Sequence, residues 1–209
     1  MVPADVSNFL AALRSMGIES YFYERPGETA LPELQKAVRK CQACSLAKTR
    51  TNVVFGEGNP HARLLFIGEA PGEEEDLQGR PFVGRAGKML DTLIDRVGLS
   101  RKDVYICNIL KCRPPGNRDP QPDEVAACSG FLRSQLDLVG PEIVCTLGRH
   151  AYNGLLGVDE KITKVRGKLR DFGKAKLLPT YHPSFLLRNQ TRIDEVWEDM
   201  DRLRDMLRH

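Results

Sequence analysis

Residues 62–68 read Ala62-Arg-Leu-Leu-Phe-Ile-Gly68, an apolar run that ends at a glycine. A continuous run of this length predicts a strand that is buried on both faces, as is typical of parallel sheets. Residues 104–109 and 143–147 have the same character. Apolar residues at helical spacing follow these strands, over residues 88–97, 122–138 and 148–156. Strands that alternate with helices predict an α/β fold with a mainly parallel central sheet.

The rest of the chain extends this pattern in both directions. Helical spacing also occurs at residues 6–16, 31–40 and 192–207. A pair of short strands is expected around Gly173, over residues 169–172 and 176–179. A chain of 209 residues is long enough for one well-filled core. We expect a single domain over residues 31–209, preceded by an N-terminal extension of unknown role over residues 1–30.

The composition is that of an ordinary soluble protein, with 41% hydrophobic and 28% charged residues. No apolar run approaches the roughly 20 residues that span a bilayer, so no membrane contact is expected. The first residues, Met-Val-Pro-Ala-Asp, lack the basic region and apolar stretch of an export signal. Six cysteines without a secretory signature favour a reducing, cytoplasmic setting over disulfides. We expect a monomer.

Charge is unevenly distributed along the chain, although the net charge is only +3. Residues 101–118 and 161–176 are rich in lysine and arginine, whereas residues 69–76 are rich in acids. Basic flanks around an acidic loop suit a polyanionic partner and a reactive centre between them. The alternative is that these residues are simply solvated charges on the surface. The charge distribution taken alone favours this alternative.

Three loops are expected to meet at one edge of the sheet, because ligand sites in such folds lie beyond the carboxyl ends of the strands. The loops cover residues 68–84, 108–120 and 181–189. The first is rich in glycine, which permits close approach of the backbone to a ligand. Its amides can also form a nest for an anion or a carbonyl oxygen. The loop lacks the Gly-Lys-Ser/Thr ending of a nucleotide-binding P-loop.

Four cysteines indicate one metal site assembled from separate segments. They are Cys41 and Cys44 in a C-x2-C pair, Cys112 in Lys-Cys-Arg-Pro-Pro, and Cys128, which follows 16 residues later. Four thiolates suit either zinc or an iron–sulfur cluster, and the spacing leaves both possibilities open. The remaining two, Cys107 and Cys145, lie in apolar strand-like runs and are expected in the core.

In combination, these motifs resemble the family 4 uracil-DNA glycosylases, the iron–sulfur type of that enzyme. The matching stretches are Gly68–Asp76, Arg80–Gly87, Val104–Pro115, Asn117–Arg118 and His182–Arg188. The resemblance runs from about residue 37 to the C-terminus. It implies a three-layer α/β/α sandwich and a [4Fe–4S] cluster held by Cys41, Cys44, Cys112 and Cys128. It also implies that the protein flips uracil out of single- or double-stranded DNA and hydrolyses its N-glycosidic bond.

The resemblance assigns three side chains to the flipped base. Phe82 would stack on the uracil ring, and Asn108 would donate to O4 and accept from N3–H. His182 would act as a neutral imidazole that donates one hydrogen bond to O2, where negative charge develops as the bond breaks. Each residue has a plainer interpretation as a core phenylalanine, a turn asparagine or a satisfied loop histidine.

The first loop would supply the rest of the catalytic site. Backbone amides from Glu69 to Gly72, including that of Ala70, would add hydrogen-bond donors to the uracil. The best-known uracil glycosylases carry an aspartate where this chain has Ala70, so the group that positions the attacking water is open. We prefer Glu75 for the water and Glu69 for the architecture of the site. Part of the run 73–75 is expected to be solvated surface.

The segment Ser184–Arg188 resembles the part of family 4 enzymes that enters the minor groove. Leu186 or Leu187 would fill the gap left by the flipped base, although either suits the core equally well. Contacts to DNA phosphates, which are largely independent of sequence, are expected from Lys111, Arg113, Arg118 and Arg188, with Ser184 beside them.

Two other functions stay open from the sequence. One is a non-catalytic iron–sulfur protein that recognises uracil or lesions in DNA. The complete set of Phe82, Asn108 and His182 argues against it. The other is a relative that traps uracil-DNA covalently. Such relatives carry an extra basic, His-containing insertion after the second strand, and this chain lacks that insertion between Asn108 and Arg118.

Overall fold

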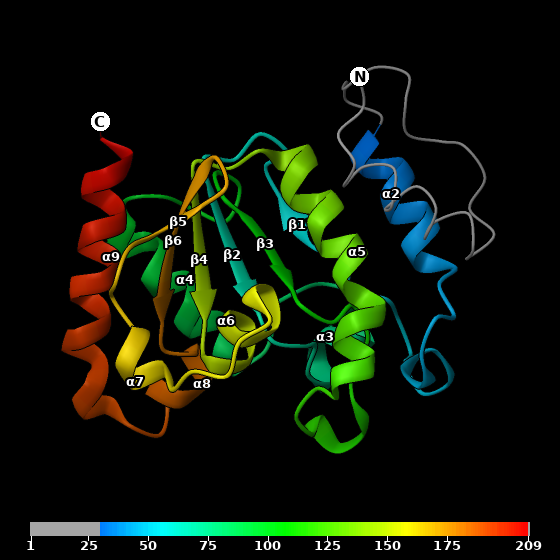
Figure 1. Cartoon of the computed structure of the whole chain (residues 1–209). Coiled ribbons are helices and arrows are strands. Elements are labelled where there is room, and N and C mark those ends of the chain that lie inside the picture. The colour runs from blue at the N-terminus through cyan, green and yellow to red at the C-terminus, as the bar shows by residue number, and fades with distance from the viewer. Residues whose placement is uncertain (1–29, 209) are drawn as a thin grey trace.

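The computed structural model describes residues 30–208, so the helix expected at residues 6–16 lies outside the described part of the chain. Figure 1 shows a central sheet with helices on both sides. The strands are β1 (Glu57–Gly58), β2 (Leu64–Gly68), β3 (Tyr105–Asn108), β4 (Ile143–Leu147), β5 (Arg170–Phe172) and β6 (Ala175–Thr180). The predicted three-layer α/β/α sandwich is confirmed.

The helices include all of those expected after residue 30. These are α2 (Ala30–Arg39), α4 (Arg85–Val97), α5 (Pro122–Val139), α6 (Arg149–Leu156) and α9 (Ile193–Leu207). Shorter helices that the sequence analysis does not predict are α3 (Glu73–Gln78), α7 (Ile162–Val165) and α8 (Pro183–Leu186). Single 3-10 turns occur at Ser45–Lys48, Pro115–Asn117 and Gln190–Arg192. None of the helices among residues 30–208 is both long and apolar enough to cross a membrane.

The strands form one mixed sheet in the order β1-β3-β2-β4-β6-β5. β2 pairs in parallel with both β3 and β4, and β4 pairs in parallel with β6. The edge strands β1 and β5 are short and antiparallel to their neighbours. The expected hairpin of β5 and β6 turns at Gly173, whose φ is 58°. Since β2, β3, β4 and β6 run in one direction, their carboxyl ends meet at one edge, where the three predicted loops begin.

Successive residues of the central strand face opposite cores. Leu65 and Ile67 of β2 lie in a core with side chains of α5 and α6. Leu64 and Phe66 lie in the other core, with side chains of α4 and α9. All four are completely buried. Burying each such side chain contributes roughly 1.5–3 kcal/mol, so the two cores hold the helices firmly against the sheet that carries the loops.

Helix α2 joins the body through a smaller core. Leu34 and Val38 of α2 pack with Phe131 of α5 and with Phe55. Figure 1 shows α2 beside α5. Because Cys41 lies two residues after the end of α2, this packing brings the N-terminal cysteine pair close to α5, the helix that contains Cys128.

Helix α3 is the main difference from the sequence analysis, which expected a loop throughout residues 69–84. Gly72 precedes the helix with extended backbone, and its N–H donates to the Glu75 carboxylate at 3.1 Å. The first turn is entirely acidic, from Glu73 to Asp76. Carboxylates at a helix N-terminus are stabilised by the exposed N–H groups and the helix dipole. The acidic run is therefore a helix start, which the glycines and prolines around it conceal.

Candidate functional site

A cavity of about 280 Å³ lies at the carboxyl edge of the sheet, where β2, β3 and β6 end. All three predicted loops contribute to its wall. The predicted site residues that line it are Glu69, Ala70, Gly72, Glu75, Phe82, Asn108, Arg118, His182 and Ser184. The structure thus brings the predicted base-contacting and catalytic residues to a single cavity.

Asn108 is the last residue of β3 and has only 2% of its surface exposed. Its side-chain oxygen Oδ1 has no hydrogen-bond partner within the described residues. A buried acceptor without a partner costs about 1–3 kcal/mol. Within residues 30–208 this oxygen accepts no bond from neighbouring backbone, as that of a turn asparagine would. The Asn108 oxygen is instead available to a donor that enters the cavity.

Gly68 leaves the room that this arrangement requires. A Cβ atom at this position would lie 2.3 Å from Oδ1 of Asn108 and 2.5 Å from Cζ of Phe82. Both distances are far shorter than a non-bonded contact between heavy atoms. Any larger residue at position 68 would therefore displace the asparagine amide and the phenylalanine ring.

Phe82 is both a buried residue and part of the cavity wall, so its two sequence interpretations are compatible. It is 6% exposed, and its ring centroid lies 5.8 Å from that of His182. Its φ of 53° is unusual for a residue other than glycine. Arg101 holds the segment by donating to the carbonyl oxygens of Pro81 at 2.7 Å and Phe82 at 3.1 Å. These bonds fix a strained backbone next to the cavity.

His182 immediately precedes α8, and its ring bonds to the start of that helix. Nδ1 accepts the Ser184 N–H at 3.1 Å and lies 2.7 Å from the Ser184 hydroxyl oxygen. A neutral ring that accepts at Nδ1 carries its proton on Nε2. Burial lowers the pKa of His182 to about 4; Glu75 opposes this shift, and Arg188 and His150 reinforce it. Near pH 7 the ring is therefore neutral, with Nε2 as its donor.

Glu75 is fixed by backbone donors from two segments. Its carboxylate accepts the N–H groups of Gly72, Val83 and Gly84 at 3.1, 2.8 and 3.0 Å. These bonds connect the start of α3 to the chain that follows Phe82. A carboxylate has about four lone-pair sites, so Glu75 retains the capacity to accept a further hydrogen bond in the cavity.

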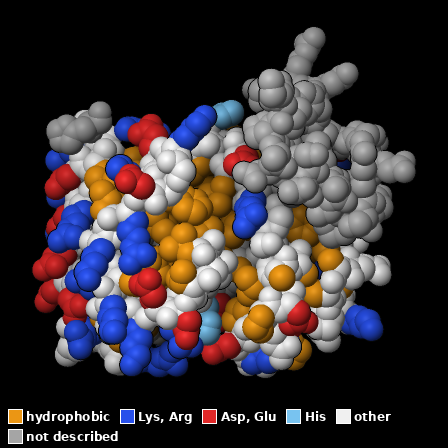
Figure 2. Space-filling view, in the orientation of Figure 1, with side chains coloured by type: hydrophobic (Ala, Val, Ile, Leu, Met, Phe, Trp, Pro, Cys, Tyr) orange, Lys and Arg blue, Asp and Glu red, His pale blue; other side chains and the backbone are white. Residues whose placement is uncertain are grey.

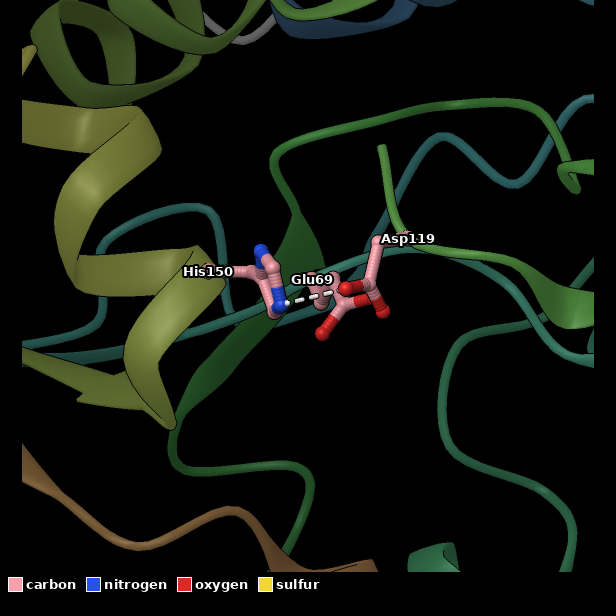
Figure 3. A group of neighbouring side chains, drawn as sticks. All are labelled: Glu69, Asp119 and His150. Carbon is pink, nitrogen blue, oxygen red and sulfur yellow. Dashed lines mark ion pairs between the residues drawn. The ribbon is translucent and has the colours of Figure 1, made fainter. Parts of the chain in front are cut away.

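Glu69 lies in a group with Asp119 and His150, which Figure 3 shows pointing toward one another. Nε2 of His150 pairs with Oδ2 of Asp119 at 3.2 Å, and Nη2 of Arg149 lies 3.2 Å from the same nitrogen. Burial raises the pKa of Glu69; His150 opposes this rise and Asp119 adds to it. Glu69 therefore lines the cavity beside a group of charged side chains, while Glu75 connects two segments of its wall.

The four predicted metal ligands line a second, narrow pocket next to α2 and α5. Nη1 of Arg50 donates to Sγ of Cys112 at 3.1 Å, and the Ala43 N–H donates to Sγ of Cys41 at 3.4 Å. Outer hydrogen bonds of this kind orient and tune metal ligands. The other two cysteines are completely buried in the two main cores.

Four thiol side chains from three separate segments thus surround one pocket. Such a donor set suits either a zinc ion or an iron–sulfur cluster.

Two of the predicted DNA contacts are wrong in this structure. Lys111 is 1% exposed, and Leu186 is completely buried in the core beside α4 and α9. Neither side chain reaches the surface, so neither contacts DNA. Leu187 is half-buried and Arg188 is exposed, so both keep access to solvent at the end of α8.

Half of the twelve lysines and arginines in the two basic stretches, residues 101–118 and 161–176, have acidic partners. Arg118 donates to Glu124 at 2.6 and 3.0 Å, and Arg113 lies 3.5 Å from Glu73. In the stretch 161–176, Arg166 pairs with Asp199 at 2.9 Å. Figure 2 shows Lys and Arg side chains mixed with acidic ones over the side of the molecule that carries α7 and α9 in Figure 1. Much of this charge stabilises the protein's own surface.

Charged residues around the two pockets that were not predicted as site residues include Arg50, Arg101, Asp119 and His150. The two arginines bond to segments that are distant in sequence, for which no local pattern exists. Asp119 directly follows a recognised motif, and His150 lies two residues after Gly148, which follows the third predicted strand. Their positions after strand ends were the available signal.

Comparisons with known proteins agree with this geometry. A family model described as the uracil DNA glycosylase superfamily matches residues 55–201, which include every residue that lines the cavity. The chain is 48% identical to a type-4 uracil-DNA glycosylase of Thermotoga maritima, over 87% of this chain and 96% of that one. It is 49% identical to a type-4 enzyme of Saccharolobus solfataricus, over 81% and 83% of the two chains. A type-5 enzyme of Pyrobaculum aerophilum is 32% identical over 65% and 67%.

Proposed function

The chain belongs to the uracil-DNA glycosylase superfamily, and on that premise we propose that its cavity binds a uracil flipped out of DNA. The enzyme hydrolyses the N-glycosidic bond and leaves free uracil and an abasic site, the first step of repair. The observation that carries the base assignment is Oδ1 of Asn108, a buried acceptor without a partner among the described residues. It suits the N3–H of uracil, and the amide nitrogen suits O4. Cytosine presents the opposite arrangement, so the same amide rejects it.

Phe82 stacks on the extruded ring in this proposal. Flipping a base costs a few kcal/mol in lost pairing and stacking. Stacking on an aromatic side chain returns roughly 1–3 kcal/mol. The bonds from Arg101 to the Phe82 segment support this role, because a ring that is already fixed loses little entropy when the base arrives.

His182 stabilises the departing uracil. Negative charge spreads over N1 and O2 as the bond to the sugar breaks, and Nε2–H of a neutral imidazole donates a hydrogen bond to O2. One such donor contributes about 3–4 kcal/mol in a site that excludes water. The low pKa of His182 supports this role, since the ring acts without transferring a proton. The amides of Ala70 and Gly72, at the cavity wall, supply further donors.

Glu75 positions the attacking water, and Glu69 shapes the adjacent wall with Asp119 and His150. Two observations support this role of Glu75: three backbone N–H groups hold its carboxylate in place, and the carboxylate can still accept a further hydrogen bond.

Glu75→Gln should reduce kcat by about 100-fold or more, within the 10²–10⁴-fold range of general acid–base catalysis. Glu69→Gln should have the smaller effect. The rates of both variants are measured in single-turnover assays. A larger loss in Glu69→Gln than in Glu75→Gln would assign the water to Glu69 instead.

The four cysteines hold a [4Fe–4S] cluster in this proposal. Four cysteine side chains around one pocket and N–H donors to two of their sulfurs suit that group. The cluster is structural: bound there, it crosslinks the segment after α2 to α5 and to the loop after β3. The catalytic steps belong to the cavity residues.

DNA is the partner, and the contacts to it are proposals for the surface residues Arg113, Arg118, Ser184, Leu187 and Arg188. Leu187 replaces Leu186 as the wedge that fills the gap left by the base.

We further propose a monomer in a reducing, cytoplasmic compartment, where DNA is present and thiolate ligands stay reduced. Residues 1–30 are proposed as an extension to one domain that covers the rest of the chain.

The deciding experiment is excision from an oligonucleotide that contains one uracil. We expect free uracil and an alkali-labile abasic site from both single- and double-stranded substrates. An oligonucleotide with cytosine at the same position is the matched control. A stable covalent adduct would instead indicate a trapping protein, and binding without cleavage would indicate a non-catalytic one.

A further inference from the structure

Lys111 is an unusual residue for the interior of this protein. It follows β3, is 1% exposed and ranks among the largest fully buried side chains. No carboxylate pairs with it among residues 30–208. Burying a lysine lowers the stability of the folded protein unless its amino group is well hydrogen-bonded. An apolar side chain of equal length would fill the same space without this loss of stability. Its presence therefore calls for a specific contact that an apolar residue cannot make.

That contact is made to the base-reading residue. Nζ of Lys111 donates to the main-chain carbonyl oxygen of Asn108 at 2.7 Å, which closes a loop of three residues at the end of β3. The same segment is fixed to the first loop, because Ile109 donates to the carbonyl oxygen of Gly68 and Leu110 to that of Glu69, both at 3.0 Å. Asn108 is thus held from both sides at the point where its side chain meets the cavity.

Lys111 also belongs to the wall of the cysteine pocket, and Cys112 is the next residue. The main chain at Lys111 is anchored as well, since its carbonyl oxygen accepts the Val54 N–H at 2.8 Å. One residue therefore borders the cysteine pocket and bonds directly to the residue that lines the uracil cavity. Only three peptide units and one hydrogen bond separate the two residues, so a change in the position of Lys111 would move Asn108.

We propose that Lys111 is a positioning residue that sets the orientation of Asn108 for uracil and links it to the cysteine site. It touches neither substrate nor the reacting atoms, and its effect passes through the carbonyl oxygen of Asn108. The inference rests on the proposed function, in which Asn108 reads the base. It assigns base discrimination in part to a buried lysine rather than to the cavity residues alone.

The test compares the Lys111→Met and Lys111→Arg variants with the wild-type enzyme. Methionine keeps an unbranched apolar stem and removes the donor, whereas arginine keeps a donor. The measurements are iron content, melting temperature, the inhibition constant of free uracil, and kcat and KM on a single-uracil oligonucleotide. Lys102→Met, at an exposed position, is the matched control.

For Lys111→Met we expect unchanged iron content and a loss of about 10-fold in both kcat/KM and uracil affinity, the value of about one hydrogen bond. Affinity for DNA without uracil should stay the same, and arginine should restore part of the loss. A purely structural residue would lower the melting temperature and leave the inhibition constant of free uracil unchanged.

Three outcomes overturn the inference: wild-type uracil affinity in Lys111→Met, loss of iron in parallel with activity, or an equal effect from Lys102→Met. Failure of the proposed function looks different, because then the wild-type enzyme itself would release no uracil. If the wild-type enzyme is active and Lys111→Met matches it, only the role of Lys111 is refuted.

Discussion

In the proposed function Asn108 recognises the base, so replacing it should separate uracil recognition from DNA binding. Asn108→Ala removes both bonds to the uracil edge and leaves N3–H and O4 unpaired in a buried cavity. We expect kcat/KM to fall by about 100-fold or more, equivalent to roughly 3 kcal/mol. Affinity for DNA without uracil, measured by fluorescence anisotropy, should change by less than about 2-fold. Equal losses in the two measurements would remove Asn108 from the reading role.

His182 makes a separate prediction about stability and pH. Its pKa is about 4 in the folded protein and near the ordinary 6.5 in the unfolded chain. Between these values the unfolded state binds a proton that the folded state does not, so stability decreases as the pH falls. The free energy of unfolding should drop by about 2 kcal/mol more between pH 7.5 and pH 5 in the wild type than in His182→Asn. Parallel curves from urea denaturation would contradict the low pKa.

Helix α4 begins against the backbone of Phe82, which leads to a prediction at the scale of elements. A Cβ at Gly87 would lie 1.9 Å from the Phe82 carbonyl oxygen, and a backbone atom has little freedom to move. Gly87→Ala should cost about 1–3 kcal/mol of stability, the usual range for overpacking, and should raise KM by displacing the stacking ring. Lys88→Ala, one exposed position further along the helix, should change stability by less than about 0.5 kcal/mol.

The cysteine pocket joins elements that are far apart in sequence. Replacing one of its cysteines should therefore have a different effect from replacing a cysteine of the core. Cys112→Ser should give a colourless protein with little iron and a lower melting temperature. Cys145→Ala, in a core strand, should keep both iron and brown colour while losing some packing. Iron analysis after anaerobic purification decides between them. Zinc bound in place of iron in the wild type would contradict the cluster.

The elements show why some of the fold is readable from sequence and some is not. Residues 143–147 were predicted to the residue, because a fully buried strand is apolar at every position. Helix α3 was missed because it is only six residues long and lies between Pro71-Gly72 and Gly79, which are typical of a loop. The three loops of the cavity could be predicted because they follow strand ends, whereas its individual residues were assigned from the resemblance to family 4 enzymes. Burial of Lys111 could not be predicted, because its partner is a main-chain carbonyl that the sequence does not specify.

At the scale of the whole molecule, the distribution of paired and unpaired charge predicts how DNA binding responds to salt. Arg188 is exposed at the end of α8, and none of the ion pairs between described residues involves it. Arg188→Gln should weaken binding of all DNA sequences alike. It should reduce the slope of log affinity against log salt by about 0.7–0.9, the value for one phosphate contact.

Arg63→Gln is the matched control for that measurement. Arg63 is also exposed, but it pairs with Glu142 at 2.7 Å just before β2, at the opposite end of the strand from the cavity. Its replacement should leave the salt slope unchanged. An equal reduction in both variants would show that net charge, rather than a contact at α8, sets the affinity.

The four cysteines are far apart along the chain, so they leave the ribosome at different times. Cys44 is made 84 residues before Cys128. At about 5–20 residues per second, a ribosome needs roughly 4–17 s to cover that interval. During this time the first two thiols have no complete site to join. If the four cysteines hold the proposed cluster, it can be inserted only at the end of translation or later. A cell short of iron would then accumulate chains in which the cluster does not yet connect the N-terminal segment to α5.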